Sequence, residues 1–297
     1  MTGQPAHRGT IQLEDAEIID HAEHPGEQFI LAVRAPECAR RATAGSFAHI
    51  QCDADIPMRR PLSIMRADPV TGHVEFLYKI VGKGLRALSQ QPAGARLSIM
   101  GPIGNGFNPS PDKPRKLMIG GGVGVPPMLF LAGQLAEQQQ FAAKQSLVLM
   151  GSEVPFPFNV QESQIPAAGL AADATHALAE LEDLGIPSRL ASLQGYPGVH
   201  EGYVTDLAHQ WLAALDQEGL DQVDMFACGP EPMLEAAARV AHEFGLQCQL
   251  CLEEFMACAV GGCAGCTVPV HGPDGIAMKR VCVDGPVFAA EAIYPPN

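Results

Sequence analysis

The sequence predicts a multidomain protein that joins a β domain and an α/β domain to a small cysteine-rich C-terminal segment. Short strand-like runs separated by turn residues fill roughly the first hundred residues, and strands alternate with helices after that. Six of the nine cysteines lie close to the C-terminus. A chain of 297 residues is long enough for two or three hydrophobic cores. We therefore place the domain boundaries at 1–110, 111–246 and 247–297.

The N-terminal part contains four apolar runs with the length and composition of β-strands, at 11–19, 29–33, 73–81 and 95–100. Turn residues such as Pro25 and Gly26 separate them, and short strands at this spacing predict a sandwich or a barrel. The Pro-rich stretch 108–114 is typical of a linker to the next domain.

The central part alternates between strands and helices, which predicts a parallel sheet with crossover connections. The clearest helix is 231–244, because apolar residues recur there at helical spacing and Gly245 suits the C-cap. A second helix is expected at about 126–138. The expected strands are 116–119, 147–150, 189–192 and 223–227.

The composition excludes some classes of partner. A formal net charge of −14 argues against nucleic acid or an anionic membrane surface. Residues 1–20 lack the apolar stretch of a signal peptide, and the uncharged run 117–136 contains too many Gly and Pro for a membrane helix. We therefore expect a cytoplasmic protein, in which nine cysteines favour metal or redox chemistry over disulfides.

The cysteines near the C-terminus follow a ligand pattern. Cys258, Cys263 and Cys266 form C-x4-C-x2-C, and Cys282 follows fifteen residues later. This is the plant-type spacing of a [2Fe-2S] cluster. Four thiolates must converge on two irons, so the loop must curl tightly, and Gly261, Gly262 and Gly265 would give it access to positive φ.

A zinc site is the alternative for these cysteines. Zinc usually binds paired C-x2-C knuckles, and Cys248 with Cys251 could form one pair and Cys263 with Cys266 the other. That arrangement leaves two cysteines of the longer pattern without a role. Cys248 and Cys251 fit better as strand residues packed in a core.

Two further motifs could bind a flavin. Arg60-Pro61-Leu62-Ser63 lies at the end of a candidate strand, where the Arg and the hydroxyl could hold a pyrophosphate and the face of a flavin ring. An exposed surface Arg is the alternative. Downstream, Leu77-Tyr78-Lys79 leads from a strand into a turn that contains Gly82 and Gly84, whose N–H groups could bind phosphate.

Two motifs could bind a nucleotide. Gly120, Gly121, Gly122 and Gly124 follow a strand and open a helix, which is the context of a phosphate-binding turn, although a plain tight turn explains them equally well. Cys228-Gly229-Pro230 lies at the end of a strand before a helix, where ligands gather in open α/β sheets. The alternative for Cys228 is a buried core thiol.

Together these motifs resemble the ferredoxin–NADP reductase superfamily, and within it the electron-transfer subunits of class 1B dihydroorotate dehydrogenase (PyrK type). The segments that show the resemblance occur in the family's order and span nearly the whole chain. They are 60–63, 78–84, 101–107, 120–124, 202–206, 228–230, 252–258 and 281–288.

The resemblance implies a FAD-binding antiparallel β-barrel at 1–110, a Rossmann-like NAD-binding α/β domain at 111–246 and a small [2Fe-2S] domain at 247–297. It implies that the cluster ligands are Cys258, Cys263, Cys266 and Cys282. FAD would be bound by Arg60, Pro61, Leu62, Ser63, Leu77, Tyr78, Lys79, Gly84 and Leu85. The nucleotide would be bound by Gly120, Gly121, Gly122, Gly124, Cys228, Gly229 and Pro230, with Cys228 as the catalytic residue near the nicotinamide.

The chain departs from the family at two places. Leu85 stands where relatives usually have Thr, so FAD binding there would rely on backbone N–H groups. Ser192-Leu193-Gln194 precedes Gly195 where many relatives carry acidic residues, which weakens the charge repulsion that rejects NADP. NAD is still expected to be preferred over NADP, because Arg189 is the only cation near in sequence and could point to the opposite face of its strand.

The implied function is electron transfer. An FMN-containing dihydroorotate dehydrogenase catalytic subunit would pass electrons through [2Fe-2S] and FAD to NAD, within pyrimidine biosynthesis and in a heterotetramer. FAD must lie between the other two groups because it exchanges electrons singly and in pairs. Two alternatives use other partners: an NAD(P)H-dependent reductase serving a ferredoxin, a sulfide-type dehydrogenase or an oxygenase, and a zinc-stapled interaction module without enzyme activity.

Overall fold

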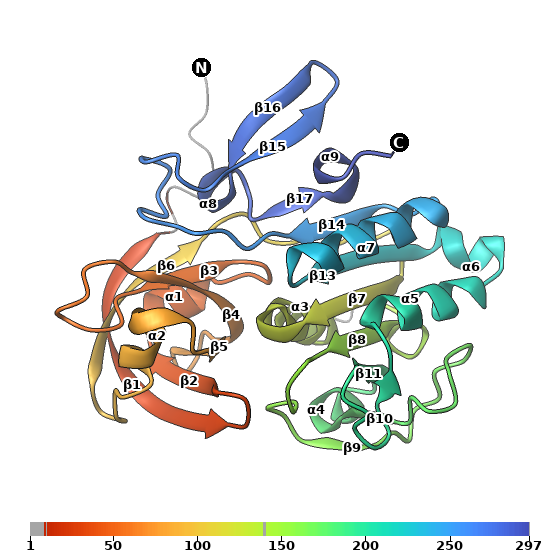
Figure 1. Cartoon of the computed structure of the whole chain (residues 1–297), viewed down its shortest axis with the longest axis horizontal. Coiled ribbons are helices and arrows are strands. Elements are labelled where there is room, and N and C mark those ends of the chain that lie inside the picture. Colours follow the sequence, from red (N-terminus) through yellow and green to blue (C-terminus); the bar gives the residue numbers. More distant parts are fainter. Residues whose placement is uncertain (1–8, 10, 139–140, 297) are drawn as a thin grey trace. The chain divides into compact units, whose positions relative to one another are not determined.

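The computed structural model describes residues 9, 11–138 and 141–296, and its internal contacts divide the chain into two compact units (Figure 1). The first unit combines Met1–Gly106 with Leu252–Val287, and the second combines Phe107–Cys251 with Phe288–Asn297. The cysteine loop thus groups with the N-terminal strands, whereas the C-terminal end groups with the α/β sheet. The division at 110/111 and 246/247 stays a prediction, and its outermost ends lie outside the described residues.

The N-terminal strands form a closed antiparallel barrel in the order β1-β2-β5-β4-β3-β6, which confirms the predicted β-barrel (Figure 1). Its interior is apolar: Ile18, Leu31, Phe76 and Ile99 are at most 1% exposed. The bounds are β1 Gln12–His24, β2 Gln28–Arg34, β3 Phe47–Ile50, β4 Arg60–Asp68, β5 His73–Lys79 and β6 Arg96–Ile103.

The barrel part of the chain differs from the sequence prediction at four places. Strand β3 was not expected, and Arg60 begins strand β4 instead of ending a strand. The predicted strand 73–81 ends at Lys79, because the helix α2 (Gly82–Leu88) begins after Val81. A further helix, α1 (Pro36–Arg41), starts where Pro36 suits the first helical turn.

The central part forms a seven-stranded sheet in the order β12-β11-β8-β7-β13-β14-β17. Along this order, all neighbouring strands between β12 and β14 are parallel, which confirms the predicted α/β domain. The strands are β7 Arg115–Gly121, β8 Leu147–Gly151, β11 Ser188–Ser192, β12 His200–Glu201, β13 Val223–Cys228, β14 Cys248–Cys251 and β17 Val287–Ala289. The helices are α3 Val125–Gln138, α4 Ala179–Asp183, α5 Val204–Ala213, α6 Gln217–Asp221, α7 Glu231–Glu243 and α9 Ala290–Ile293, and a small ladder pairs β9 (Val160–Glu162) with β10 (His176–Leu178).

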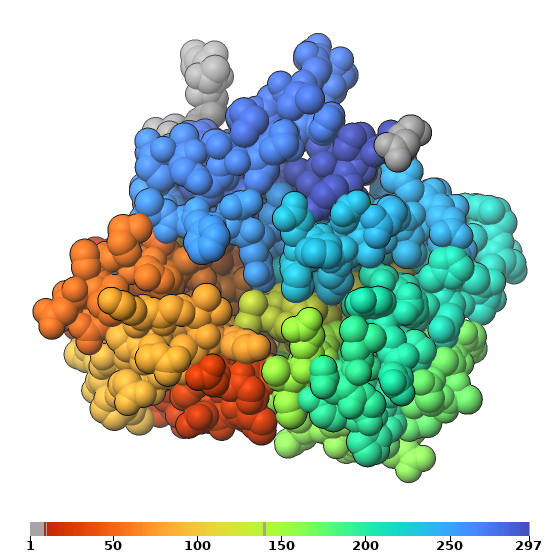
Figure 2. All heavy atoms as spheres, in the orientation of Figure 1, coloured from red at the N-terminus to blue at the C-terminus, as the bar shows by residue number. Residues whose placement is uncertain are grey.

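The C-terminal cysteine segment contains a hairpin of β15 (Thr267–Gly272) and β16 (Gly275–Arg280), followed by the short helix α8 (Val281–Asp284). The hairpin projects from the surface (Figure 2), and Ile276 and Met278 are 65% and 61% exposed. A hairpin with so little covered apolar surface is marginally stable by itself. The segment therefore needs another source of stability, such as a bound metal group.

None of the helices within the described ranges is long and apolar enough to cross a membrane.

Candidate functional site

The three cysteines of the C-x4-C-x2-C motif lie on one tightly curled loop between β14 and β15. Of the three glycines expected to take positive φ, Gly261 does so at 78°. The other left-handed positions are occupied by Ala259 and Ala264, each with φ of 54°. Since alanine rarely adopts this conformation, the loop is held there by its surroundings.

The curl of the loop turns backbone N–H groups toward sulfur. The N–H of Cys263 donates to the Sγ of Cys258, and the N–H of Gly265 donates to the Sγ of Cys263, both at 3.4 Å. Partial burial of the Cys258 thiol raises its pKa, but the N–H groups of Val260, Cys263 and Gly262 outweigh that effect and lower the pKa to about 7. The loop thus favours the thiolate form, which is the form that binds iron.

The fourth cysteine of the pattern, Cys282, lies in α8 and is 1% exposed. Burial, followed by the neighbouring Cys266 thiol, raises the pKa of Cys282 to about 12. In the part of the chain that the structure describes, no three His, Cys, Asp or Glu side chains converge as ligands of a single metal ion. The donor set, four thiols with N–H groups directed at sulfur, fits a [2Fe-2S] cluster.

The zinc alternative needed Cys248 and Cys251 as one pair of ligands. Both lie in β14 and are 2% and 3% exposed, which confirms the prediction that they are core strand residues. Burial raises the pKa of the Cys248 thiol strongly. Neither side chain lies on the cysteine loop.

The first unit brings together three residues predicted to bind the flavin. Arg60 begins β4, and its guanidinium lies over Gly84 in α2, where a Cβ would come within 2.9 Å of Cζ, Nε and Nη2. The guanidinium also donates through Nη1 to the carbonyl oxygens of Met58 and Arg59. Leu85 lies next to Gly84 and is buried. A larger residue at position 84 would therefore require the Arg60 guanidinium to move away from α2.

The side chains of Tyr78 and Leu77 are buried within the barrel unit. The Tyr78 hydroxyl is hydrogen-bonded to His21 Nε2 at 2.7 Å, and its ring stacks on Phe29 with centroids 5.4 Å apart. Burial raises the pKa of Tyr78, and Leu77 is 2% exposed. Contacts of these two residues with a flavin would therefore come from their backbone.

The residues predicted to bind the nucleotide meet at the C-terminal ends of β7 and β13. These strands are parallel neighbours, with Gly120 opposite Cys228. A Cβ on Gly124 would lie 2.3 Å from the carbonyl oxygen of Cys228, and one on Gly121 would lie 2.5 Å from the sulfur of Met233. The glycines thus allow two strand ends and the start of α7 to pack closely, at the edge of the sheet where ligands bind in such folds. Cys228 itself is 0% exposed, and its role near the nicotinamide stays a prediction.

We expect Gly124→Ala to destabilise the protein by roughly 1–3 kcal/mol, because the new methyl group would overlap the backbone of Cys228. The shift of the turn should also raise the KM for NADH. Gly133→Ala in α3 is the matched control, since a Cβ there meets nothing within 4 Å and alanine favours the helix. Urea unfolding of both variants tests this, and equal stability for the two would contradict it.

Arg189, the only cation close in sequence to the segment 192–195, makes its hydrogen bonds with residues of the protein. It is 7% exposed and donates to the hydroxyl of Ser163 at 2.8 Å and to the carbonyl oxygens of Ser188 and Ile165. Burial lowers the pKa of Arg189, with the charge of Glu182 acting in the opposite direction. Its guanidinium is thus buried and hydrogen-bonded within the protein, which argues against a role in binding the 2′-phosphate of NADP.

We expect Arg189→Ala to leave the ratio of kcat/KM for NADPH and NADH unchanged while lowering stability. The reason is that the variant removes three internal hydrogen bonds but no nucleotide contact. Dye reduction with each nucleotide measures the ratio, and thermal unfolding measures the stability. A large fall in NADPH activity alone would show that Arg189 does contact the nucleotide.

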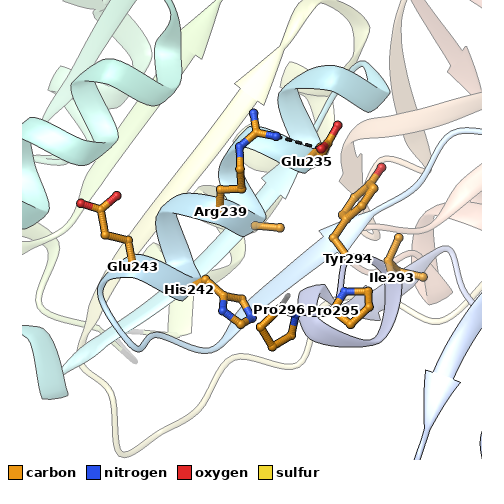
Figure 3. A pocket seen from close by; sticks show the side chains of 9 residues that line it. Glu235, Arg239, His242, Glu243, Ile293, Tyr294, Pro295 and Pro296 are labelled. Carbon is orange, nitrogen blue, oxygen red and sulfur yellow. Dashed lines mark hydrogen bonds and ion pairs between the residues drawn. The ribbon is translucent and has the colours of Figure 1, made fainter.

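A groove of about 630 Å³ lies between α7 and the residues after α9 (Figure 3). Two of the charged side chains that line it bind each other, since Arg239 donates to Glu235 at 2.8 Å. None of the residues predicted to bind a cofactor lines this groove. It therefore adds nothing to the flavin, nucleotide or cluster sites.

Sequence reasoning missed Arg280, whose guanidinium donates to the carbonyl oxygen of Gly261 in the cysteine loop at 3.0 Å. The available signal was a cation two residues before the fourth cysteine. It also missed the buried pair of Lys116 in β7 and Asp224 in β13, which are 108 residues apart in sequence.

Comparison with known proteins agrees with this arrangement. Residues 253–294 match the family described as the iron-sulfur cluster binding domain of dihydroorotate dehydrogenase B. The chain is 32% identical over 249 residues to the dihydroorotate dehydrogenase B (NAD(+)) electron transfer subunit of Caldanaerobacter subterraneus subsp. tengcongensis, covering 84% of this chain and 86% of that protein. It is 36% identical over 251 residues to the subunit of that name from Geobacillus thermodenitrificans, covering 83% and 84%.

Solved structures agree on the fold. An NADH-dependent reduced ferredoxin–NADP oxidoreductase, studied for flavin-based electron bifurcation, superimposes with a TM-score of 0.73 at 23% identity, covering 99% of this chain and 91% of that chain. The ferredoxin reductase in carbazole 1,9a-dioxygenase has a TM-score of 0.58 at 22% identity, covering 80% and 67%. The likeness extends over both units of the chain.

Proposed function

We infer the function from one premise: this chain belongs to the family of the electron transfer subunits of dihydroorotate dehydrogenase B (NAD(+)). We propose that it passes electrons from an FMN-containing dihydroorotate dehydrogenase catalytic subunit to NAD, through a [2Fe-2S] cluster and FAD. This is an oxidoreductase step of pyrimidine biosynthesis, and we place it in the cytoplasm. The proposed assembly is a heterotetramer with the catalytic subunit.

The observation that best supports this proposal is the cysteine loop within the matched residues 253–294. It presents Cys258, Cys263 and Cys266, with N–H groups directed at the sulfurs of the first two, and Cys282 follows in α8. These four cysteines would bind the cluster. The segments 1–110, 111–246 and 247–297 would bind FAD, NAD and the cluster respectively.

The remaining assignments follow from the two other site regions. Arg60 and the backbone around Gly84 would hold FAD, which when bound exchanges electrons both singly and in pairs. The glycine turn at the end of β7 and the Cys228-Gly229-Pro230 turn would bind NAD. Leu85 offers no hydroxyl, so the backbone N–H groups at the start of α2 would supply that contact.

Assays of the purified chain with and without its partner test this function. The chain alone is expected to reduce dyes with NADH and to show no oxidation of dihydroorotate. Adding the FMN subunit should produce NAD reduction by dihydroorotate. Turnover of dihydroorotate by the chain alone would contradict the division of labour, and failure with the FMN subunit present would favour a reductase that serves a ferredoxin, a sulfide-type dehydrogenase or an oxygenase.

The absorption spectrum separates these redox functions from a zinc-stapled interaction module. Flavin and a [2Fe-2S] cluster together give a brown protein, whereas a zinc protein without flavin is colourless. A colourless preparation that contains zinc would reject the proposed function.

A further inference from the structure

Arg280 lies where the segments bearing the third and fourth cysteines meet. In the β15–β16 ladder it is opposite Thr267, the residue after Cys266. The N–H of the next residue, Val281, donates to the carbonyl oxygen of Cys266 at 2.9 Å. Cys282 follows one residue later. The backbone around Arg280 therefore fixes Cys266 and Cys282 relative to each other.

The Arg280 side chain reaches the segment that bears the other two cysteines. Its Nη1 donates to the carbonyl oxygen of Gly261 at 3.0 Å, midway between Cys258 and Cys263. At Gly261 the backbone has φ of 78°, and a Cβ there would lie 2.8 Å from Val283, so the loop is pressed against α8. A single guanidinium thus connects the loop with the hairpin and helix that position the remaining ligands.

Asp284 holds this guanidinium in place. Its Oδ2 accepts from the Nε of Arg280 at 3.2 Å and from the backbone N–H of Arg280 at 2.8 Å. The Arg280 side chain is 32% exposed, so solvent screens its charge only in part.

A cation in this position affects the electron affinity of a four-thiolate cluster. Such a cluster bears a net negative charge that grows by one on reduction, so a nearby positive charge stabilises the reduced form more than the oxidised form. Net charge and hydrogen bonding around the cluster are the terms by which proteins set its potential.

We propose that Arg280, oriented by Asp284, is a positioning residue of the cluster site that raises the cluster's reduction potential and ties the cysteine loop to α8. The inference rests on the cluster assignment in the proposed function. The Arg280 cation sets the potential, whereas its forked hydrogen bonding between Gly261 and Asp284 retains the cluster.

The two roles separate in a redox titration of the full chain followed by electron paramagnetic resonance. Arg280→Gln is expected to shift the cluster midpoint to more negative values, because it removes the cation. Asp284→Asn should shift the midpoint in the opposite direction, because it leaves the Arg280 charge unneutralised. Lys279→Met is the matched control: it removes an equal charge from an exposed neighbour and should leave the midpoint unchanged.

Arg280→Lys tests the forked contact, since lysine keeps the charge but lacks the planar fork. Its midpoint should stay near that of the unmodified chain, while a chelator removes the cluster several-fold faster. Should Arg280→Gln fail to retain a cluster, Arg280→Lys and Asp284→Asn decide the result. If the variants that retain a cluster show unshifted midpoints, and Arg280→Lys loses its cluster no faster than the unmodified chain, this inference is wrong while the proposed function still stands. An unmodified chain that shows no cluster signal would overturn the proposed function and this inference with it.

Discussion

Replacing Cys282 by Ser is expected to abolish the iron–sulfur absorbance of the protein while its flavin absorbance remains. The reason is that Cys282 is the proposed fourth ligand, and the loop and α8 contain no cysteine besides Cys282 and the three cysteines of the motif that could replace it. Serine lacks the soft thiolate that iron–sulfur clusters require. The flavin should stay because the residues predicted to bind it lie in the barrel strands and in α2, outside the cysteine loop.

Loss of the cluster should also loosen the C-terminal segment. Strand β16 is largely exposed and β15 is half-buried, and metal binding in such a small segment is coupled to its folding. Limited proteolysis of Cys282→Ser should therefore cut within residues 258–282 before it cuts the barrel. Cys258→Ser, Cys263→Ser and Cys266→Ser are expected to behave in the same way.

Cys251→Ser is the matched control for these variants. It makes the identical chemical change at a buried cysteine of β14, outside the cysteine loop, and should keep the full cluster absorbance. Cys248→Ser should do the same. Loss of the cluster in Cys251→Ser, with retention in Cys258→Ser, would show that the ligands are assigned to the wrong cysteines.

The elements that could be predicted from sequence are those whose pattern is local. Helix α7 repeats apolar residues at helical spacing and ends before Gly245, which has the positive φ of a C-cap. The cysteine spacing likewise lies within a short segment. Strands β3 and β4 were harder, because β3 has only four residues and Pro61 at the second position of β4 opposes a strand in any local reading.

The parts of the site that could not be predicted depend on contacts between distant residues. Which residues would take positive φ in the loop was predicted from glycine alone, whereas Ala259 and Ala264 are held there by their surroundings. The environment of Arg189 was also hidden, because its partners Ser163 and Ile165 lie on a different segment. The burial of Lys116 could not be predicted from sequence either, since lysine is almost never fully buried.

Lys116 and Asp224 form a buried ion pair at the N-terminal ends of β7 and β13. Lys116 is 0% exposed, and its Nζ lies 3.0 Å from Asp224 Oδ2. Both groups also bind Ser110 in the linker: Nζ donates to its carbonyl oxygen, and its N–H donates to Asp224 at 2.7 Å. Burial lowers the pKa of Lys116, and the charge of Asp224 opposes that shift. The pair thus anchors the Pro-rich linker to the sheet.

Lys116→Met is expected to destabilise the second unit by about 3–5 kcal/mol, because it leaves the Asp224 carboxylate buried without a counter-charge. Adding Asp224→Asn should recover most of that loss, since the remaining side chain is then neutral. The control is Arg239→Ala at an exposed pair with Glu235, which should cost less than about 1 kcal/mol. Urea unfolding of the three variants measures these differences. Equal stability of Lys116→Met and Arg239→Ala would contradict this prediction. A double variant less stable than Lys116→Met would contradict it too. Either result would show that the buried pair does not anchor the linker, despite its hydrogen bonds to Ser110.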